Sequence, residues 1–435
     1  MRYYSTNGKK ELVSLEEAVI KGLADDGGLF MPEKLTGLLP EGFAENLDKF
    51  SKEEIGFTVG KGLFGGDLPE DVLEKIVRET LSFDIPLENL FENKFSLELF
   101  HGPTLAFKDV GARFMARLLS HFIVESREKE IHVLVATSGD TGSAVANGFL
   151  GVDGIRVHVL YPKGKVSRIQ ESQFTTLGNN ITALEVDGTF DDCQRLVKGA
   201  FSDKEVRKTL SITSANSINI GRLLPQTFYY FIGVSELEKT TGRKGDVVFS
   251  VPSGNFGNLT AGLMAHKMGL PVSRFIAANN ENNVFEEYLQ TGKFNPRPSK
   301  TTLANAMDVG NPSNFARILA LYDGSHEQIK KLISAHSYDD LQIASMIGSV
   351  CAERGYILDP HGACGYRGLT EELKKEERGI FLETAHPAKF QEIINTLVLG
   401  GIDLPDTLQN FLKGKKDTKE ISATYDDFKE YLMAI

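Results

Sequence analysis

Residues 131–161, IHVLVATSGDTGSAVANGFLGVDGIRVHVLY, decide the fold class of this chain. Two apolar runs, 131–137 and 155–161, have the length and composition of buried strands. The glycine-bearing turn SGDTG follows the first run, and SAVANGFL is compatible with a helix. Strand, turn, helix and strand in this order form a βαβ unit, so we expect the two strands to lie parallel in one sheet.

The same alternation continues along the chain. We expect helices over 166–177 and 191–201 and strands over 181–186 and 210–214. A second alternation starts with a strand at 246–251, followed by the turn PSGNFGN, a helix and another strand. Between the two series lies a polar break, residues 239–245 (KTTGRKG). We therefore predict an α/β protein with two αβ domains of mostly parallel sheets, over 96–240 and 241–435, the latter including C-terminal helices. Residues 1–95 are expected to form an N-terminal helical and loop segment that packs on this core.

Composition narrows the classes of function. The chain has 435 residues and a net charge of −11, which argues against a general nucleic-acid binder. The three cysteines have no metal-ligand spacing, so we expect no metal site and reduced thiols. No run of 18 or more apolar residues occurs, and the N-terminus turns polar too early for a signal peptide. A cytoplasmic protein without a membrane span is expected.

One lysine stands in an unusual setting. Lys108 ends the run HGPTLAFK (101–108), directly after an aliphatic and aromatic cluster. Removal from water lowers the pKa of a lysine, and a neutral amine can form an imine with a carbonyl compound. The alternative is an ordinary lysine at a helix start, and this segment alone favours the alternative.

Two glycine-bearing turns follow strands. Residues 253–258 (SGNFGN) could present backbone amides to a phosphate at a helix N-terminus, or could be an ordinary turn. This loop is neither a Walker A loop nor a G-x-G-x-x-G fingerprint, which disfavours a nicotinamide oxidoreductase. Residues 137–142 (TSGDTG) could hold a carboxylate or a phosphate, or could be an ordinary turn at a helix N-terminus. The string DTGS within this region also occurs in aspartic proteases, but a single copy on a βαβ unit excludes that enzyme.

Two further segments offer polar groups. Residues 216–222 (NSINIGR) bring amides, a hydroxyl and the guanidinium of Arg222 within seven residues, although their spacing alone favours a helix cap followed by a surface arginine. Thr384 follows a short strand at 379–382, where active sites of αβ proteins form. His386 is expected to be a structural loop residue, and Asp359-Pro-His-Gly a turn.

Taken together, these strings resemble one family, the pyridoxal-phosphate-dependent threonine synthases of the longer bacterial and fungal type. They appear in the family's order between residues 3 and 390: YYSTNG, GLADDGGLFMPE, HGPTLAFKD, ATSGDTGSA, LYPKGKVSRIQ, NSINIGR, VPSGNFGN, AMDVGNPSNFAR and ETAHPAKF. The resemblance implies the fold of tryptophan synthase β and cysteine synthase, with pyridoxal 5'-phosphate in the cleft between two αβ domains.

The resemblance also assigns residues. Lys108 matches the catalytic lysine that holds the cofactor as an imine. The cofactor phosphate would lie on Ser253, Gly254, Asn255, Phe256, Gly257 and Asn258, and Thr384 would face the pyridine nitrogen. Substrate would bind to Ser138, Thr141, Asn216, Ser217 and Arg222. Asp140 departs from the wider fold type, in which asparagine is common near the cofactor's ring oxygen, and its role stays open.

The implied reaction is that of a lyase in amino-acid biosynthesis: O-phospho-L-homoserine and water give L-threonine and phosphate in the last step of threonine biosynthesis. A monomer or homodimer is expected. Alternatives are another enzyme of the same fold, such as a threonine or serine dehydratase or a β-replacing synthase, and a non-catalytic relative that binds the cofactor or phosphohomoserine.

Overall fold

The first sheet contains the βαβ unit predicted for residues 131–161. In the computed structural model, which describes residues 1–126 and 130–435, its strand order is β14-β8-β7-β6-β9 and every neighbouring pair is parallel. The strands are β6 (Ile131–Ala136), β7 (Ile155–Pro162), β8 (Ile181–Asp187), β9 (Ile212–Ser214) and β14 (Lys419–Ser422). The helices of this part are α4 (Lys108–Ser126), α5 (Asp140–Phe149), α6 (Arg168–Thr175), α7 (Phe190–Ser202) and α8 (Lys204–Thr209).

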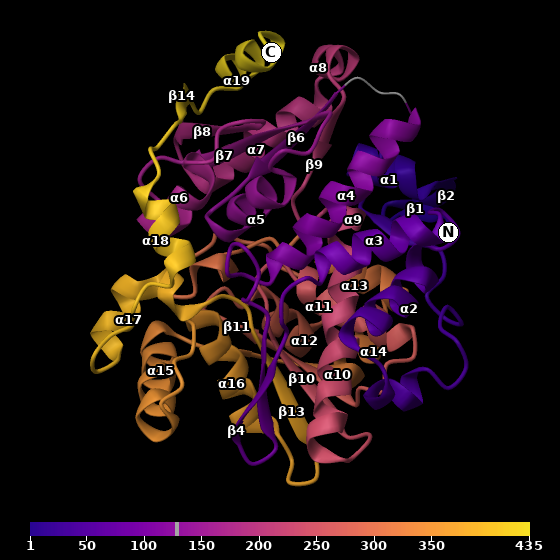
Figure 1. Ribbon diagram of the computed structural model, residues 1–435, viewed down its shortest axis with the longest axis vertical. Helices are drawn as coiled ribbons and strands as arrows, with labels where there is room; N and C mark the ends of the chain where they lie inside the picture. The colour runs from indigo at the N-terminus through magenta and orange to yellow at the C-terminus, as the bar shows by residue number, and fades with distance from the viewer. Residues whose placement is uncertain (127–129) are drawn as a thin grey trace.

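The second sheet has six strands in the order β12-β11-β10-β13-β5-β4. All neighbours are parallel except β4 and β5, which form an antiparallel pair. The strands are β4 (Leu87–Phe91), β5 (Lys94–Glu98), β10 (Val247–Pro252), β11 (Arg274–Asn279), β12 (Ile333–Ser337) and β13 (Arg378–Glu383). In Figure 1 the first sheet occupies the upper part of the molecule and the second sheet the lower part. The predicted α/β class with mostly parallel sheets is confirmed.

Most helices of the second part follow or precede its strands. They are α9 (Ile220–Leu223), α10 (Thr227–Thr241), α11 (Gly257–Lys267), α12 (Val284–Thr291), α13 (Phe315–Leu321), α14 (His326–Leu332), α15 (Asp340–Arg354), α16 (Pro360–Glu372) and α17 (Gln391–Leu397). Helix α10 is buried on nearly all sides, from Thr227 to Ser235 and again at Leu237 and Glu238. It ends at Gly242, whose φ of 64° closes the helix inside the predicted break.

The N-terminal segment combines helices with a small sheet that the sequence did not reveal. Strands β1 (Tyr3–Ser5), β2 (Gly8–Val13) and β3 (Phe30–Pro32) pair antiparallel in the order β2-β1-β3. The helices are α1 (Leu15–Lys21), η1 (Ala44–Lys49), α2 (Lys52–Phe64) and α3 (Glu70–Thr80). Serine side chains cap two of them, because Ser14 and Ser51 accept the amide hydrogens of Glu17 and Glu54.

The chain passes between the sheets in two places that differ from the predicted allotment. Strand β5 pairs with β13 of the second sheet, and β4 extends that sheet by pairing with β5. At the other end, α18 (Asp406–Lys413) contacts α6, β14 pairs with β8, and α19 (Tyr425–Met433) contacts α7 and α8. The C-terminal residues therefore return to the first sheet (Figure 1). Ile421 and Phe428 bury their side chains in an apolar cluster of the first sheet, and the charge-rich residues 413–420 before them did not indicate this. The boundaries 1–95, 96–240 and 241–435 remain a proposal.

None of the described helices is both long and apolar enough to cross a bilayer. Within residues 1–126 and 130–435, no three histidine, cysteine, aspartate or glutamate side chains gather in a way that could hold a metal ion.

Candidate active site

Lys108 is the first residue of α4, and a carboxylate beside it fixes the loop that leads into the helix. Asp109 is buried and accepts hydrogen bonds from the amide of Thr104 (2.9 Å) and from its hydroxyl (2.6 Å). Leu105 has a positive φ of 56°, which a leucine adopts only at a cost. The loop is thus held in one conformation, and the amine of Lys108 starts from a fixed position.

The same loop is joined to the end of β13. The amide of Phe107 donates to the carbonyl of Thr384 (2.9 Å), and the amide of His386 donates to the carbonyl of Leu105 (3.0 Å). Ala106 and Ala385 form an isolated antiparallel bridge between these two hydrogen bonds. Lys108 and Thr384, which are far apart in sequence, therefore lie in one site.

The surroundings of Lys108 favour a neutral amine. Burial lowers its pKa to about 8; the carboxylate of Asp140 opposes this shift, and the cations of Lys389 and Arg222 add to it. A lysine with this pKa carries a usable fraction of neutral amine at physiological pH. The segment 101–108 taken alone favoured an ordinary lysine, and the burial of this amine argues against that alternative.

The loop at 253–258 connects β10 to α11 and has the geometry of an anion cradle. Phe256 has a left-handed φ of 58°. The hydroxyl of Ser253 donates to the side-chain oxygen of Asn258 (2.5 Å), which braces the loop across the helix start. A Cβ atom on Gly254 would lie 2.5 Å from the Cα of Met307, so only glycine fits there. Within the described part of the chain, the amides of residues 254–256 donate no hydrogen bond.

This cradle is hydrogen-bonded directly to the 216–222 segment, which follows β9 of the first sheet. Asn255 donates its side-chain amide to the hydroxyl of Ser217 (2.6 Å), and Asn314 donates to the same oxygen (3.3 Å). Arg317 is fully buried and donates hydrogen bonds to the backbone carbonyls of Ser217 (3.0 Å) and Ile218 (2.6 Å). Loops from the two sheets thus meet at Ser217.

Asn216 and Arg222 are both engaged with the backbone. The Asn216 amide donates to the carbonyl of Ala136 (2.9 Å), which fixes the end of β6. Arg222 is buried and donates through Nη1 to the carbonyl of Ala215, while its Nε has no partner among the described residues. Burial lowers the pKa of this guanidinium to about 10, against the attraction of Asp109. Arg222 remains a cation with an unused donor.

The turn at 137–142 is organised by a hydroxyl that sequence reasoning passed over. Thr137 is buried, and its oxygen accepts the amides of Gly139 (2.9 Å) and Gly142 (2.8 Å). Ser138 and Thr141 are half-buried, and their hydroxyls make no hydrogen bond within the described chain. These two donors are therefore free to bind a ligand.

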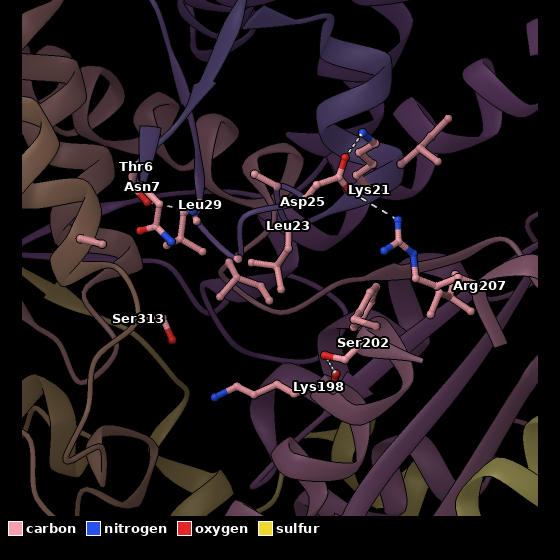
Figure 2. A pocket seen from close by; sticks show the side chains of 18 of the residues that line it. Thr6, Asn7, Lys21, Leu23, Asp25, Leu29, Lys198, Ser202, Arg207 and Ser313 are labelled. Atoms are coloured by element: carbon pink, nitrogen blue, oxygen red, sulfur yellow. Dashed lines mark hydrogen bonds and ion pairs between the residues drawn. The ribbon is translucent and has the colours of Figure 1, made fainter. Parts of the chain in front are cut away.

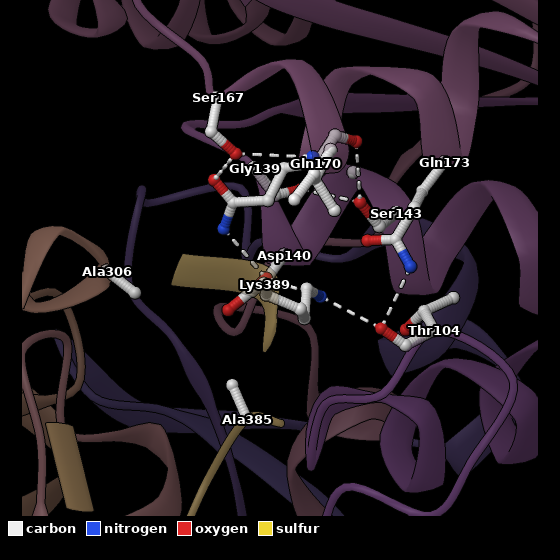
Figure 3. A network of polar contacts seen from close by, with 12 residues as sticks. Thr104, Gly139, Asp140, Ser143, Ser167, Gln170, Gln173, Ala306, Ala385 and Lys389 are labelled. Atoms are coloured by element: carbon white, nitrogen blue, oxygen red, sulfur yellow. Dashed lines mark hydrogen bonds and ion pairs between the residues drawn. The ribbon is translucent and has the colours of Figure 1, made fainter. Parts of the chain in front are cut away.

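Asp140 is paired with a lysine and a glutamine. Lys389, which sequence reasoning had not assigned, places its Nζ 2.7 Å from Oδ1 of Asp140 and 2.9 Å from the carbonyl of Thr104. Gln170 donates to the same Asp140 oxygen (2.9 Å). Figure 3 shows this network from the 137–142 turn to the segment after Thr384. Burial alone would raise the pKa of Asp140, but Lys389 and Lys108 outweigh it and hold the pKa well below its usual range. The only advance signal was the place of Lys389 in the string ETAHPAKF.

Comparison with known proteins identifies the arrangement. Residues 92–382 match the family described as "Pyridoxal-phosphate dependent enzyme", and residues 2–81 match "Threonine synthase N terminus". Threonine synthase of Escherichia coli is 44% identical over 411 residues, which cover 94% of each chain. The chain belongs to the threonine synthases. The crystal structure of the E. coli threonine synthase superposes with a TM-score of 0.92 at 40% identity and covers 100% of both chains.

Other solved structures agree with this family. The structure titled as pyridoxal-phosphate-bound threonine synthase of Brucella melitensis has a TM-score of 0.91 at 34% identity, over 100% of this chain and 99% of that one. Maize serine racemase, at 17% identity and a TM-score of 0.53 over 79% of this chain and 96% of its own, shares the fold alone. This threonine synthase is accordingly a pyridoxal-phosphate-dependent enzyme.

The residues of this threonine synthase fit that cofactor. Free amides at 254–256 lie at the start of α11, where the helix dipole favours a phosphate. Lys108 has the lowered pKa that covalent attachment to a carbonyl group requires. Thr384 presents an uncharged side chain just after the end of β13.

Proposed function

We propose that this chain converts O-phospho-L-homoserine and water into L-threonine and phosphate, the last step of threonine biosynthesis. Apart from family membership, one structural observation supports this proposal. An amine of lowered pKa, Lys108, lies where anion-binding donors from both sheets converge, and Asn255 joins those donors to Ser217 through a hydrogen bond of 2.6 Å. Such a site suits a substrate with an amine at one end and a phosphate at the other.

We assign the cofactor to Lys108, to residues 253–258 and to Thr384. The amides of the 253–258 loop would hold the cofactor phosphate. Thr384 would accompany the pyridine nitrogen with a neutral hydroxyl and leave it largely unprotonated. When bound, pyridoxal phosphate supplies an electron sink for negative charge at the substrate carbons.

The substrate would bind on the side of the first sheet. Ser138 and Thr141 carry hydroxyls without partners, which would hold the carboxylate or the phosphate. Ser217 and Arg222 would attract the other anionic group, and Asn216 would fix the strand end between them. As phosphate departs from Cγ, the unused donor of Arg222 is suited to stabilise the developing charge.

Lys108 would move the protons. Its free amine takes the proton from Cα and returns one as the product forms, because its pKa of about 8 suits both directions near neutral pH. A second proton leaves Cβ before phosphate is released. One proton is delivered to Cγ, which becomes a methyl group, and water supplies the hydroxyl at Cβ while its other proton replaces the one taken from the enzyme, so the reaction balances with one water consumed.

The deciding experiment measures phosphate release and L-threonine formation from O-phospho-L-homoserine by the purified holoenzyme. Equal amounts of the two products support the proposal. If the enzyme instead releases 2-oxo acid from threonine or serine, it is a dehydratase of the same fold. Binding without turnover would identify a non-catalytic relative. We further propose that the protein acts in the cytoplasm as a monomer or homodimer.

A further inference from the structure

A large cavity lies outside the site described above. It measures about 790 Å³ and lies between residues 20–29 of the N-terminal segment and the helices α7 and α8 (Figure 2). Ile218 and Ser313 also line it. Small-molecule sites have volumes of roughly 300–1,000 Å³, so this cavity is large enough for an organic ligand.

The lining has an apolar body and a cationic edge. Apolar side chains contribute from both walls, including Leu23, Leu29 and Phe201. The charged residues are Lys21, Lys198 and Arg207 against the single carboxylate of Asp25. An excess of positive charge is unusual on a protein whose net charge is −11.

One of these cations has no partner. Asp25 is shared by Lys21 (2.9 Å) and Arg207 (3.4 Å), and that exposed cluster is internally paired. Lys198 is exposed and makes no side-chain hydrogen bond or ion pair within the described residues, and Figure 2 shows its side chain pointing toward the side on which Ser313 lies. A ligand anion would find this ammonium group available.

The cavity is separate from the proposed active site but shares a wall with it. None of the residues that we assign to cofactor or substrate lines it. However, Ile218 follows Ser217 directly, and Arg317 holds the carbonyls of both. The amide of Ser313 donates to the side-chain oxygen of Asn255 (2.6 Å), a residue of the cradle. A molecule in the cavity would therefore contact Ile218, next to Ser217, and Ser313, which is hydrogen-bonded to the 253–258 loop.

We propose that this cavity is a binding site for a small organic anion with an apolar body, held by Lys198, and that its occupancy alters substrate binding through Ile218 and Ser313. The apolar walls would cover the body of the ligand, and Lys198 would pair with its anionic group. The effect on substrate binding rests on the proposed function, whereas binding itself does not.

Isothermal titration calorimetry of the holoenzyme with anilinonaphthalene sulfonate tests the binding. We expect one equivalent to bind, and Lys198→Glu to weaken it by about tenfold or more. Lys204→Glu on neighbouring α8 is the matched control, because it changes the net charge equally without lining the cavity, and should alter affinity less than about twofold. Uncharged phenylnaphthylamine should bind wild type and Lys198→Glu alike. No binding of the sulfonate, or equal binding by the Lys198→Glu variant, would overturn the proposal.

A second measurement tests the coupling. Sulfonate at a concentration near its dissociation constant for the wild type should change KM for O-phospho-L-homoserine in the wild type and change it much less in Lys198→Glu. An unchanged KM in the wild type refutes the coupling. If the holoenzyme binds the sulfonate at this site but never turns over phosphohomoserine, the proposed function fails while the binding site stands.

Discussion

The Nζ atom of Lys389 lies 2.7 Å from Oδ1 of Asp140, and both side chains are almost completely removed from solvent. The pair joins the turn after β6 to the segment after β13, one from each sheet. A buried charge without its partner is costly. The two residues therefore stabilise the contact between these two segments only when both charges are present. Asp140 therefore has a partner other than the cofactor, which accounts for a carboxylate at a position where its charge would otherwise be unfavourable.

Removing one member of this pair should cost more than removing both. We expect Lys389→Met to lower the free energy of unfolding by about 3–5 kcal/mol, because Asp140 is left buried and unpaired. The double variant Asp140→Asn with Lys389→Met should recover much of this loss, since no lone charge remains. Urea unfolding followed by circular dichroism measures both. Additive losses in the double variant would show that the two charges do not depend on each other.

Lys108→Ala tests the attachment of the cofactor. The purified wild type is expected to show a visible absorbance band that borohydride removes, and the variant should lack it while still binding free pyridoxal phosphate through residues 253–258. Lys204→Ala serves as the control, because it removes an exposed lysine of α8 outside the site and should keep the band. A colourless wild type that also fails to bind added cofactor would contradict the assignment.

Arg222→Ala should separate substrate binding from cofactor binding. Loss of a charged hydrogen bond to an anion costs about 1.5–3 kcal/mol, so kcat/KM for phosphohomoserine should fall by about 10–100-fold or more. The cofactor band should persist, because Arg222 is not part of the cradle. Arg222→Lys retains the charge without the planar fork and is expected to recover part of the activity. Parallel loss of cofactor and turnover would refute the substrate role.

Sequence patterns predicted the elements of this fold better than their partners. The four strands between residues 131 and 214 occur within two residues of the predicted bounds, because apolar runs and glycine turns are local signals; α5 begins three residues before the predicted stretch SAVANGFL, and α8 was not predicted. Pairing of β5 with β13, or of β14 with β8, depends on contacts between distant residues and left no local trace. The site shows the same limit. Lys108 and the 253–258 loop stood in recognisable strings, whereas the bond from Lys389 to Asp140 exists only after both sheets are folded.

Gly254→Ala should impair cofactor binding without unfolding the protein. The added Cβ would lie 2.5 Å from the backbone of Met307, so the 253–258 loop has to shift and its amides no longer converge. We expect the dissociation constant of pyridoxal phosphate, measured by equilibrium dialysis, to rise about tenfold or more. Gly348→Ala in α15 is the control: its Cβ would lie 3.7 Å from the nearest atom, and helix propensity should add about 0.5–1 kcal/mol of stability. Unchanged cofactor affinity in Gly254→Ala would contradict the cradle.

A buried histidine that contacts the C-terminal helix should make the stability of the protein depend on pH. His158 is buried between His132 (3.0 Å) and the hydroxyl of Tyr431 in α19 (2.7 Å). Burial, with His132 adding to it, lowers the His158 pKa from 6.5 to about 3. Below pH 6.5 the imidazole of His158 is protonated in the unfolded chain but stays neutral in the folded protein. The free energy of unfolding therefore falls as the pH drops from 6.5 toward 3.

This single group should remove about 2 kcal/mol of unfolding free energy between pH 6.5 and pH 5. His158→Gln keeps a polar side chain that cannot titrate, so its stability should fall less over the same interval by about that amount. Urea midpoints of both proteins at the two pH values give the difference. If wild type and His158→Gln lose stability in parallel, the imidazole is protonated without cost in the folded state, and the contact with Tyr431 does not depend on its neutral form.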